Sequence, residues 1–325
     1  LTPNGKVDRG SLPPPDRLRS DEAQRVLPRN LVEETLAKIW AGVLGVETLG
    51  IHDNFFELGG DSILSIQIIA RANQAGLGLS PRHIFQHQTI AELAAVAGTN
   101  VSAAAEQGVV AGFVPLTPVQ ARFFAHDQPQ PHYYNQAMML RVAESLDAAV
   151  LERAFEQLLV HHDALRLRFS RTGHGWQQSI APPNGELFLE TIDLAHLPEG
   201  EQSDVLQQRA ASLQASLNLE GPLMRAALFK RGAPRPGNLL IVVHHLAVDG
   251  VSWGVLLDDL QTLYTQLSHG ADLTLPAKTT SFKSWSEQLM AHAKSNALRA
   301  EAPYWLSLFA DPVTRMPVDY ENGIN

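Results

Sequence analysis

Short amphipathic segments separated by polar turns fill the first third of the chain and predict a small helical domain. Asn30, with Glu33 three residues later, marks a helix start; apolar residues then recur at helical spacing, and Gly45 ends the segment. Three more helix starts are marked in a similar way, at Ser62, Ser80 and Thr89. We therefore expect a four-helix bundle over residues 27–98, about the size of a minimal independent domain.

The second of these helices carries a regular apolar stripe. Ile63, Ile66 and Ile69 follow one another at intervals of three residues, and Gly76 lies beyond the end of the segment. Side chains three residues apart share one face of a helix, so we expect this stripe to face the core.

Strands and helices alternate from residue 113 onward, which predicts a larger α/β domain extending to residue 325. Apolar runs predict strands at 136–142, 165–169, 224–229 and 239–245, and helical periodicity covers 147–161, 203–217, 252–267, 283–294 and 301–309. Residues 99–112 are rich in Ala, Gln and Gly, and predict a linker between the two domains. Residues 17–26 form a second linker, and the Pro-rich residues 1–16 predict a tail.

Composition narrows the classes of function. The chain has 325 residues, 45% of them hydrophobic and 18% charged, with a net charge of −9. This acidic balance argues against a nucleic-acid partner, because binding phosphate requires a basic surface. The absence of cysteine excludes disulfides, cysteine-ligated zinc and cysteine nucleophiles, so any thioester chemistry needs a thiol from a cofactor.

No segment predicts membrane insertion or export. The longest apolar run, residues 239–243, is far shorter than a bilayer span, and no signal-peptide pattern opens the chain. We therefore expect a cytoplasmic protein without a membrane partner. The chain opens at Leu1 and stops at Asn325 without a terminating pattern, so we also expect a segment cut at both ends.

The run Gly59-Gly60-Asp61-Ser62 presents a hydroxyl directly before the second helix. Two glycines allow a tight turn that leaves a serine side chain unshielded. A hydroxyl at a helix N-terminus is well placed to carry a phosphate, because unpaired amides and the helix dipole favour negative charge. For these four residues alone, a helix N-cap at Asp61 or Ser62 is the simpler explanation.

The longer run Asp53-Asn54-Phe55-Phe56-Glu57-Leu58-Gly59-Gly60-Asp61-Ser62-Ile63 resembles the core motif of peptidyl carrier proteins. In that family the matching serine, here Ser62, carries 4′-phosphopantetheine, whose thiol holds an aminoacyl or peptidyl group as a thioester. The resemblance extends over the helical pattern of residues 27–98, with Gly60 and Asp61 in supporting positions. It also implies a phosphopantetheinyl transferase as a partner.

A shorter match lies in the tail. Thr2-Pro3-Asn4-Gly5-Lys6-Val7-Asp8-Arg9 resembles the last motif of adenylation domains, in which the matching lysine, here Lys6, contacts the acyl-adenylate. A compact ammonium group suits the negative charge that develops on the phosphate and carboxylate of the acyl-adenylate. Taken alone, Asn-Gly-Lys is an ordinary turn, but its place before a carrier domain favours an adenylation-domain tail over residues 1–16. We expect Lys6 to catalyse nothing in this segment.

A second candidate site lies where the apolar run Leu239-Leu240-Ile241-Val242-Val243 continues into His244-His245. Side chains alternate along a strand, so the two histidines must point to opposite faces, and one of them can face a given channel. For a bare histidine pair, one buried ring and one exposed ring are the ordinary explanation. A zinc site is weakly supported because no cysteine or second ligand cluster accompanies the pair, and we predict no metal.

The run from His244 to Trp253 resembles the H-H-x-x-x-D-G motif of the condensation superfamily of non-ribosomal peptide synthetases, which has the chloramphenicol-acetyltransferase-like fold. The resemblance implies a catalytic motif of His244, His245 and Asp249. His245 would face a tunnel entered by the carrier arm, and Asp249 would be structural and pair with an arginine. An imidazole suits proton transfer near neutral pH. The run His161-His162-Asp163-Ala164-Leu165-Arg166 resembles the family's arginine motif, which makes Arg166 the expected partner of Asp249.

Domains of this superfamily join, epimerize or cyclize peptides, and three features resemble epimerization domains. Asp61 stands where carriers that serve condensation domains more often have histidine. Condensation domains usually have Arg-His-Glu where this chain has His161-His162-Asp163. The runs 249–253 and 116–124 also resemble the variants found in epimerization domains. The resemblance implies that residues 113–325 are the first half of an epimerization domain, working beside adenylation and condensation domains.

Epimerization of a thioester needs two proton-handling groups on opposite sides of the α-carbon, and local stabilisation of the enolate. His245 would be one group, and in the family the other is a glutamate in the second half of the domain. We therefore expect this segment to be inactive in epimerization by itself. Two alternatives remain: a peptide-bond-forming condensation domain, and a carrier joined to a non-catalytic docking domain.

Overall fold

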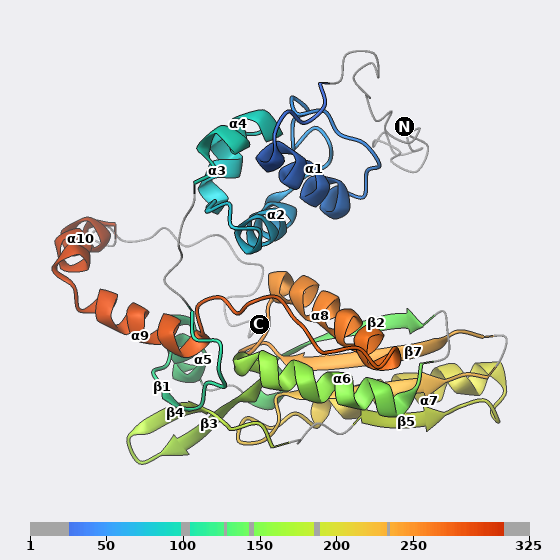
Figure 1. Ribbon diagram of the computed structural model, residues 1–325. Coiled ribbons are helices and arrows are strands. Elements are labelled where there is room, and N and C mark those ends of the chain that lie inside the picture. The colour runs from blue at the N-terminus through green and yellow to red at the C-terminus, as the bar shows by residue number, and fades with distance from the viewer. Residues whose placement is uncertain are drawn as a thin grey trace, which may run out of the picture. The chain divides into compact units, whose positions relative to one another are not determined.

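The computed structural model describes residues 26–98, 105–126, 129–142, 146–184, 189–232 and 235–308. These residues fall into two compact units (Figure 1). One holds the helical domain up to Ala105, together with the segments 250–259 and 274–277. The other holds the rest of the chain from Glu106 onward, with two β-sheets. Lys6 and the expected adenylation-type tail lie outside the described residues.

Four helices form the first unit, as the sequence predicts. They are α1 (Leu31–Leu44), α2 (Ser62–Gln74), α3 (Pro81–Gln86) and α4 (Ile90–Val96). Local caps determine where these helices begin: the Asn30 side chain accepts from the N–H of Glu33, and Thr89 accepts from that of Glu92. Gly45, with φ at 65°, closes α1 in the left-handed conformation.

The core of the helical domain is aromatic and aliphatic. Its largest members are Trp40 and Phe55, both fully buried, whose rings meet edge to face with centroids 5.2 Å apart. The expected stripe on α2 is partly wrong: Ile69 is buried, but Ile63 and Ile66 are 47% and 37% exposed. A helix repeats every 3.6 residues, so the buried face follows Ser65, Ile68, Ile69 and Ala72 instead.

Two sheets organise the second unit, which confirms the predicted α/β class. β1 (Gly112–Val114), β4 (Gly175–Ile180) and β3 (Leu167–Thr172) form an antiparallel sheet in that order. β2 (Asn135–Val142), β7 (Gly237–His244), β6 (Met224–Lys230) and β5 (Leu189–Asp193) form the second sheet in that order, with β5 parallel to β6. β7 is therefore a central strand, hydrogen-bonded on both sides.

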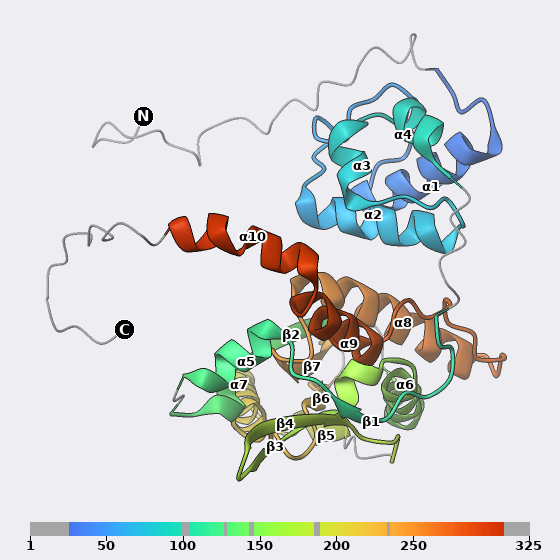
Figure 2. The same cartoon turned by 90° about the vertical axis from the view of Figure 1, so that its left-hand side faces the viewer.

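Helices alternate with these strands and follow them along the chain. They are α5 (Pro118–Ala125), α6 (Ala148–His161), α7 (Glu199–Ala215), α8 (Gly250–Ser268), α9 (Phe282–Ala293) and α10 (Asn296–Ser307). Figures 1 and 2 show α6 and α7 on opposite sides of the four-stranded sheet, and Leu213 of α7 packs against Phe229 and Val242. Among the helices that the structure describes, none combines the length and apolarity that a membrane crossing needs.

The predicted linker over 99–112 is too long at its C-terminal end. Gln107 exchanges side-chain hydrogen bonds with the backbone of Lys278, at 3.0 and 2.9 Å, and Val110 is 3% exposed within the core of the second unit. The second domain therefore begins before Phe113. Val110 lies in a stretch of small residues without apolar periodicity, so the sequence did not mark it as part of a core.

Candidate functional site

Ser62 is the first residue of α2, and its side chain is exposed. Asp61 caps this helix, since its Oδ1 accepts from the backbone N–H groups of Ile63 and Leu64, both at 2.8 Å. Of the two N-cap alternatives, the structure therefore selects Asp61. The hydroxyl of Ser62 lies outside the cap, at the surface of the domain.

The glycine pair before Ser62 is required by the backbone. Gly59 has a φ of 93°, which favours glycine, and a Cβ on Gly60 would lie 2.5 Å from the ring of Phe55. The N–H of Gly60 also donates to the Phe55 carbonyl at 2.9 Å. The turn that presents Ser62 is thus held directly against the aromatic core.

Three serines lie within residues 26–98, and their surroundings differ. Ser65 is fully buried and donates to the Ser62 carbonyl at 2.7 Å, and Ser80 is half-buried at the start of α3. Ser62 is the exposed one, at the N-terminus of a 13-residue helix beside the exposed Ile63 and Ile66. An accessible hydroxyl in this position fits the attachment of 4′-phosphopantetheine.

His244, the last residue of β7, is fully buried. Its Nε2 lies 2.9 Å from the Pro131 carbonyl, so this nitrogen carries the hydrogen, and its Nδ1 accepts from the N–H of Leu246 at 3.2 Å. Burial lowers the pKa of His244, although the bond to Pro131 acts in the opposite direction. Backbone groups thus hold both nitrogens of a neutral ring.

His245 has different partners, as alternation along the strand predicts. Its ring is half-buried and stacks on Tyr134, with centroids 4.8 Å apart. Nδ1 lies 2.8 Å from the Val248 carbonyl, and because a carbonyl accepts only, Nδ1 carries the hydrogen. Nε2 is left as the basic nitrogen of the neutral ring, 3.3 Å from the side-chain nitrogen of Gln136.

The expected pairing of Arg166 with Asp249 is wrong. Arg166 donates to the carboxylate of Asp163 and to the carbonyls of Leu159, Val110 and Ala181. The side chains of Arg166 and Asp163 are 4% and 7% exposed, so a partner three residues away satisfies the buried charge. Asp249 itself is exposed and directly precedes α8.

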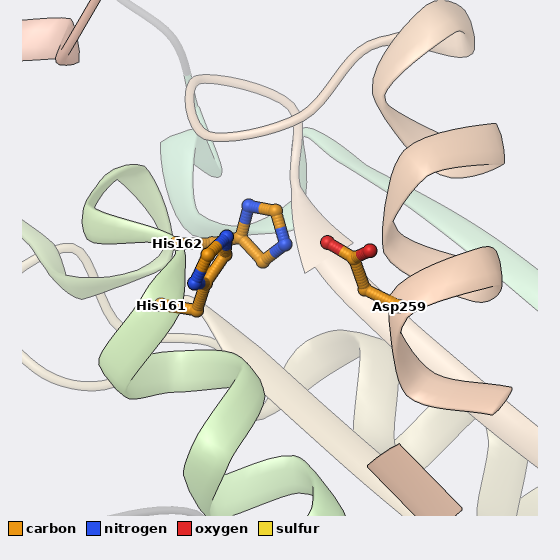
Figure 3. Close-up of side chains that lie close together, drawn as sticks. All are labelled: His161, His162 and Asp259. Carbon is orange, nitrogen blue, oxygen red and sulfur yellow. The ribbon is translucent and has the colours of Figure 1, made fainter. Parts of the chain in front are cut away.

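A cluster that the sequence did not predict comprises His161, His162 and Asp259, whose candidate ligand atoms all lie within 4.8 Å of one another (Figure 3). Two imidazoles and a carboxylate are donors that Zn²⁺ accepts. The same set also suits a carboxylate bonded to imidazole, and no second observation among the described residues points to an ion. We assign this cluster no metal.

The helical domain is compact and presents an exposed serine at the start of a helix. The mixed-sheet domain that follows it carries a histidine pair at the end of a central strand. Together these features define a carrier domain joined to a condensation-type domain. Comparison with known families agrees. The condensation domain family matches residues 110–323, and the phosphopantetheine attachment site family matches residues 34–97. The chain belongs to the condensation domain family and includes a carrier domain of the kind that bears 4′-phosphopantetheine on a serine.

Relatives of known function are large peptide synthetases. A linear gramicidin synthase protein of Brevibacillus parabrevis is 53% identical over 98% of this chain, and chondramide synthase cmdD of Chondromyces crocatus is 51% identical over all of it. The chain spans 4% and 8% of the length of these two relatives. The prediction of a non-ribosomal peptide synthetase segment is confirmed.

Solved structures agree on the fold of the second domain. The epimerization domain from the third module of tyrocidine synthetase B matches with a TM-score of 0.61 and 36% identity, over 66% of this chain and 49% of that one. The starter condensation domain of rhizomide synthetase RzmA matches with a TM-score of 0.53 and 24% identity, over 62% and 48% of the two chains. The latter supports the fold alone.

Proposed function

We propose that this chain carries an aminoacyl or peptidyl thioester on Ser62, and that His245 moves the α-proton in an epimerization between the L and D forms. 4′-Phosphopantetheine, when attached, supplies the thiol that the chain lacks, since the chain contains no cysteine. One observation carries the proposal: the Nδ1–H of His245 is fixed on the Val248 carbonyl, so that Nε2 remains as a base.

The reaction would proceed by proton transfer. Nε2 of His245 accepts the α-proton, the electron pair of the broken C–H bond moves onto the thioester carbonyl as an enolate, and a proton returned on the opposite face inverts the centre. His244 takes no part in the transfer, because backbone groups hold both of its ring nitrogens. Its role is to fix the end of β7.

Epimerization is favoured over condensation by two observations. The tyrocidine epimerization domain is 36% identical over 66% of this chain. Asp61, at the carrier motif, is the residue expected of a carrier that serves an epimerization domain. Condensation remains the second candidate, because the matching family is described as condensation domains.

Loading tests the first half of the proposal. With coenzyme A and a phosphopantetheinyl transferase, the chain should gain the mass of one phosphopantetheine group, located by peptide mapping at Ser62. Ser62→Ala should abolish the gain, and Ser80→Ala, at a half-buried serine of the same domain, should retain it. Unchanged mass, or a label at another residue, would refute the assignment.

Chiral analysis of the released amino acid tests the second half, in the complete synthetase that contains this chain. The loaded enzyme should form D-aminoacyl thioester without a partner module, and should exchange the α-proton with deuterium from heavy water. His245→Ala should slow both by about 10²–10⁴-fold, the usual contribution of a general base. His174→Ala, at an exposed histidine between β3 and β4, is the matched control. Peptide-bond formation without D-product would instead indicate condensation.

A further inference from the structure

Gln136 on β2 lies beside the proposed base. β2 pairs antiparallel with β7, which places Gln136 opposite Val243, and the N–H of His245 donates to the Tyr134 carbonyl at 2.8 Å, extending the ladder. Residues two apart along a strand share a face, so Gln136 and His245 are diagonal neighbours on one face of the sheet. The side-chain nitrogen of Gln136 lies 3.3 Å from Nε2 of His245.

The direction of this hydrogen bond follows from the other side of the ring. Because Nδ1 of His245 donates to the Val248 carbonyl, the neutral ring has its lone pair on Nε2. The NH₂ group of Gln136 then donates to Nε2. Once Nε2 carries a proton, that contact becomes donor against donor, and the amide oxygen is the group that fits.

We propose that Gln136 is a positioning residue for His245, whose amide donates to Nε2 of the neutral ring and turns by half a rotation to accept from Nε2–H after proton transfer. This inference rests on the proposed function of His245. An amide suits the task because it offers a donor and an acceptor of similar reach without a charge. A carboxylate in its place would retain the proton, and an ammonium group would oppose its uptake.

The other partners that the structure gives the His245 ring are uncharged, as the amide of Gln136 is. Besides Gln136, its partners are the Val248 carbonyl and the stacked ring of Tyr134. The titratable residue next to His245 in the chain is His244, whose ring is held neutral by its backbone partners. Among the partners that the structure gives the His245 ring, Gln136 alone can exchange a donor for an acceptor by rotation.

Kinetics of side-chain variants in the complete synthetase test this role. Gln136→Met keeps the length of the side chain but removes both polar groups, and should lower kcat for epimerization about five- to tenfold, with KM and the melting temperature unchanged. Gln136→Glu should move the pH dependence of kcat to higher pH, because a carboxylate favours the protonated ring. Gln177→Met, at an exposed glutamine on β4, is the control. A Gln136→Met enzyme with the wild-type kcat and pH profile would overturn the proposal.

Nitrogen NMR of histidine-labelled protein tests the same contact without turnover. The resonances of His245, assigned by their loss in His245→Gln, should show the Nδ1–H tautomer in the wild type. Gln136→Met should displace the Nε2 resonance, and an unchanged Nε2 resonance would count against the contact. If the wild type forms no D-product while Gln136→Met still displaces the resonance, the proposed function fails and the positioning contact stands.

Discussion

His244 and His245 are neighbours in the chain, and their surroundings give them different chemistry. The first is buried, with both nitrogens bonded to backbone, whereas the second is half-buried with a basic nitrogen facing an amide. Strand alternation produces this difference, because successive side chains enter different environments. Under the proposed function, the motif uses one histidine for structure and the other for proton transfer.

Protonation of His244 should destabilise the second domain. Burial lowers its pKa in the folded state, so the unfolded chain binds more protons at acidic pH and stability rises with pH. The loss should begin as the pH falls through the unfolded value, about 6.5, and continue down to the folded value. Urea unfolding between pH 5 and 8 measures this dependence.

The matched variant for that measurement is His244→Gln, which stays neutral throughout this range. Its unfolding free energy should fall less on acidification than that of the wild type, while the other histidines titrate equally in both proteins. Equal pH dependence of the two proteins would contradict the role assigned to His244.

Secondary-structure elements are joined by a buried ion network. Asp163 binds Arg166 and accepts from the N–H of Val110 at 3.3 Å, and the ammonium of Lys278 lies 3.5 Å away. The network therefore connects the end of α6 to the segment before β1 and to the segment before α9. Val110 and Lys278 lie far from Asp163 in sequence, so these two connections depend on the complete fold.

Removing one partner of this network should be costly. Asp163→Ala leaves the Arg166 guanidinium buried without its carboxylate and should lower the free energy of unfolding by about 3–5 kcal/mol. The double variant Asp163→Ala/Arg166→Met should recover part of that loss, because no buried charge remains. Asp204→Ala, at an exposed carboxylate on α7, should change stability by less than about 0.5 kcal/mol. Urea denaturation of the three variants and the wild type measures these changes. A loss below about 1 kcal/mol for Asp163→Ala would be incompatible with this role.

Local signals predicted the elements well, whereas the partners of individual side chains were predicted less well. The helix starts at Asn30 and Thr89 are encoded within three residues, so the sequence alone identifies them. β4 and β5 alternate poorly because polar residues occupy much of each strand, and neither was predicted. Arg166 pairs with Asp163, three residues away, because both side chains are buried together, and the family resemblance pointed to Asp249 instead. The contact of Gln136 with His245 depends on strand register, which spacing does not reveal.

At the scale of the whole molecule, two domains divide the proposed chemistry. The carrier domain presents Ser62, and the sheet domain presents His245. The match to the tyrocidine epimerization domain covers 49% of that structure. The proposed function also needs a second proton-handling group, which the family resemblance implies is a glutamate in the second half of such a domain. Attachment and proton transfer should therefore be separable experimentally.

The polypeptide of these 325 residues, produced by itself, should accept phosphopantetheine and an aminoacyl group but form no D-product. The physical reason is that inversion needs a proton donor on the face opposite His245. Mass spectrometry of the loaded chain, followed by chiral chromatography of the released amino acid, checks both halves. D-product at the rate of the complete synthetase would show that these residues already supply both groups.

The alternation at the end of β7 also limits how this domain can evolve. Deleting or inserting one residue between Gly237 and His244 would turn every following side chain to the other face of the sheet. The ring anchored by Pro131 would then exchange places with the ring beside Gln136. Natural variation should accordingly replace one apolar side chain by another within this strand, and should change the length of the chain in the connecting loops.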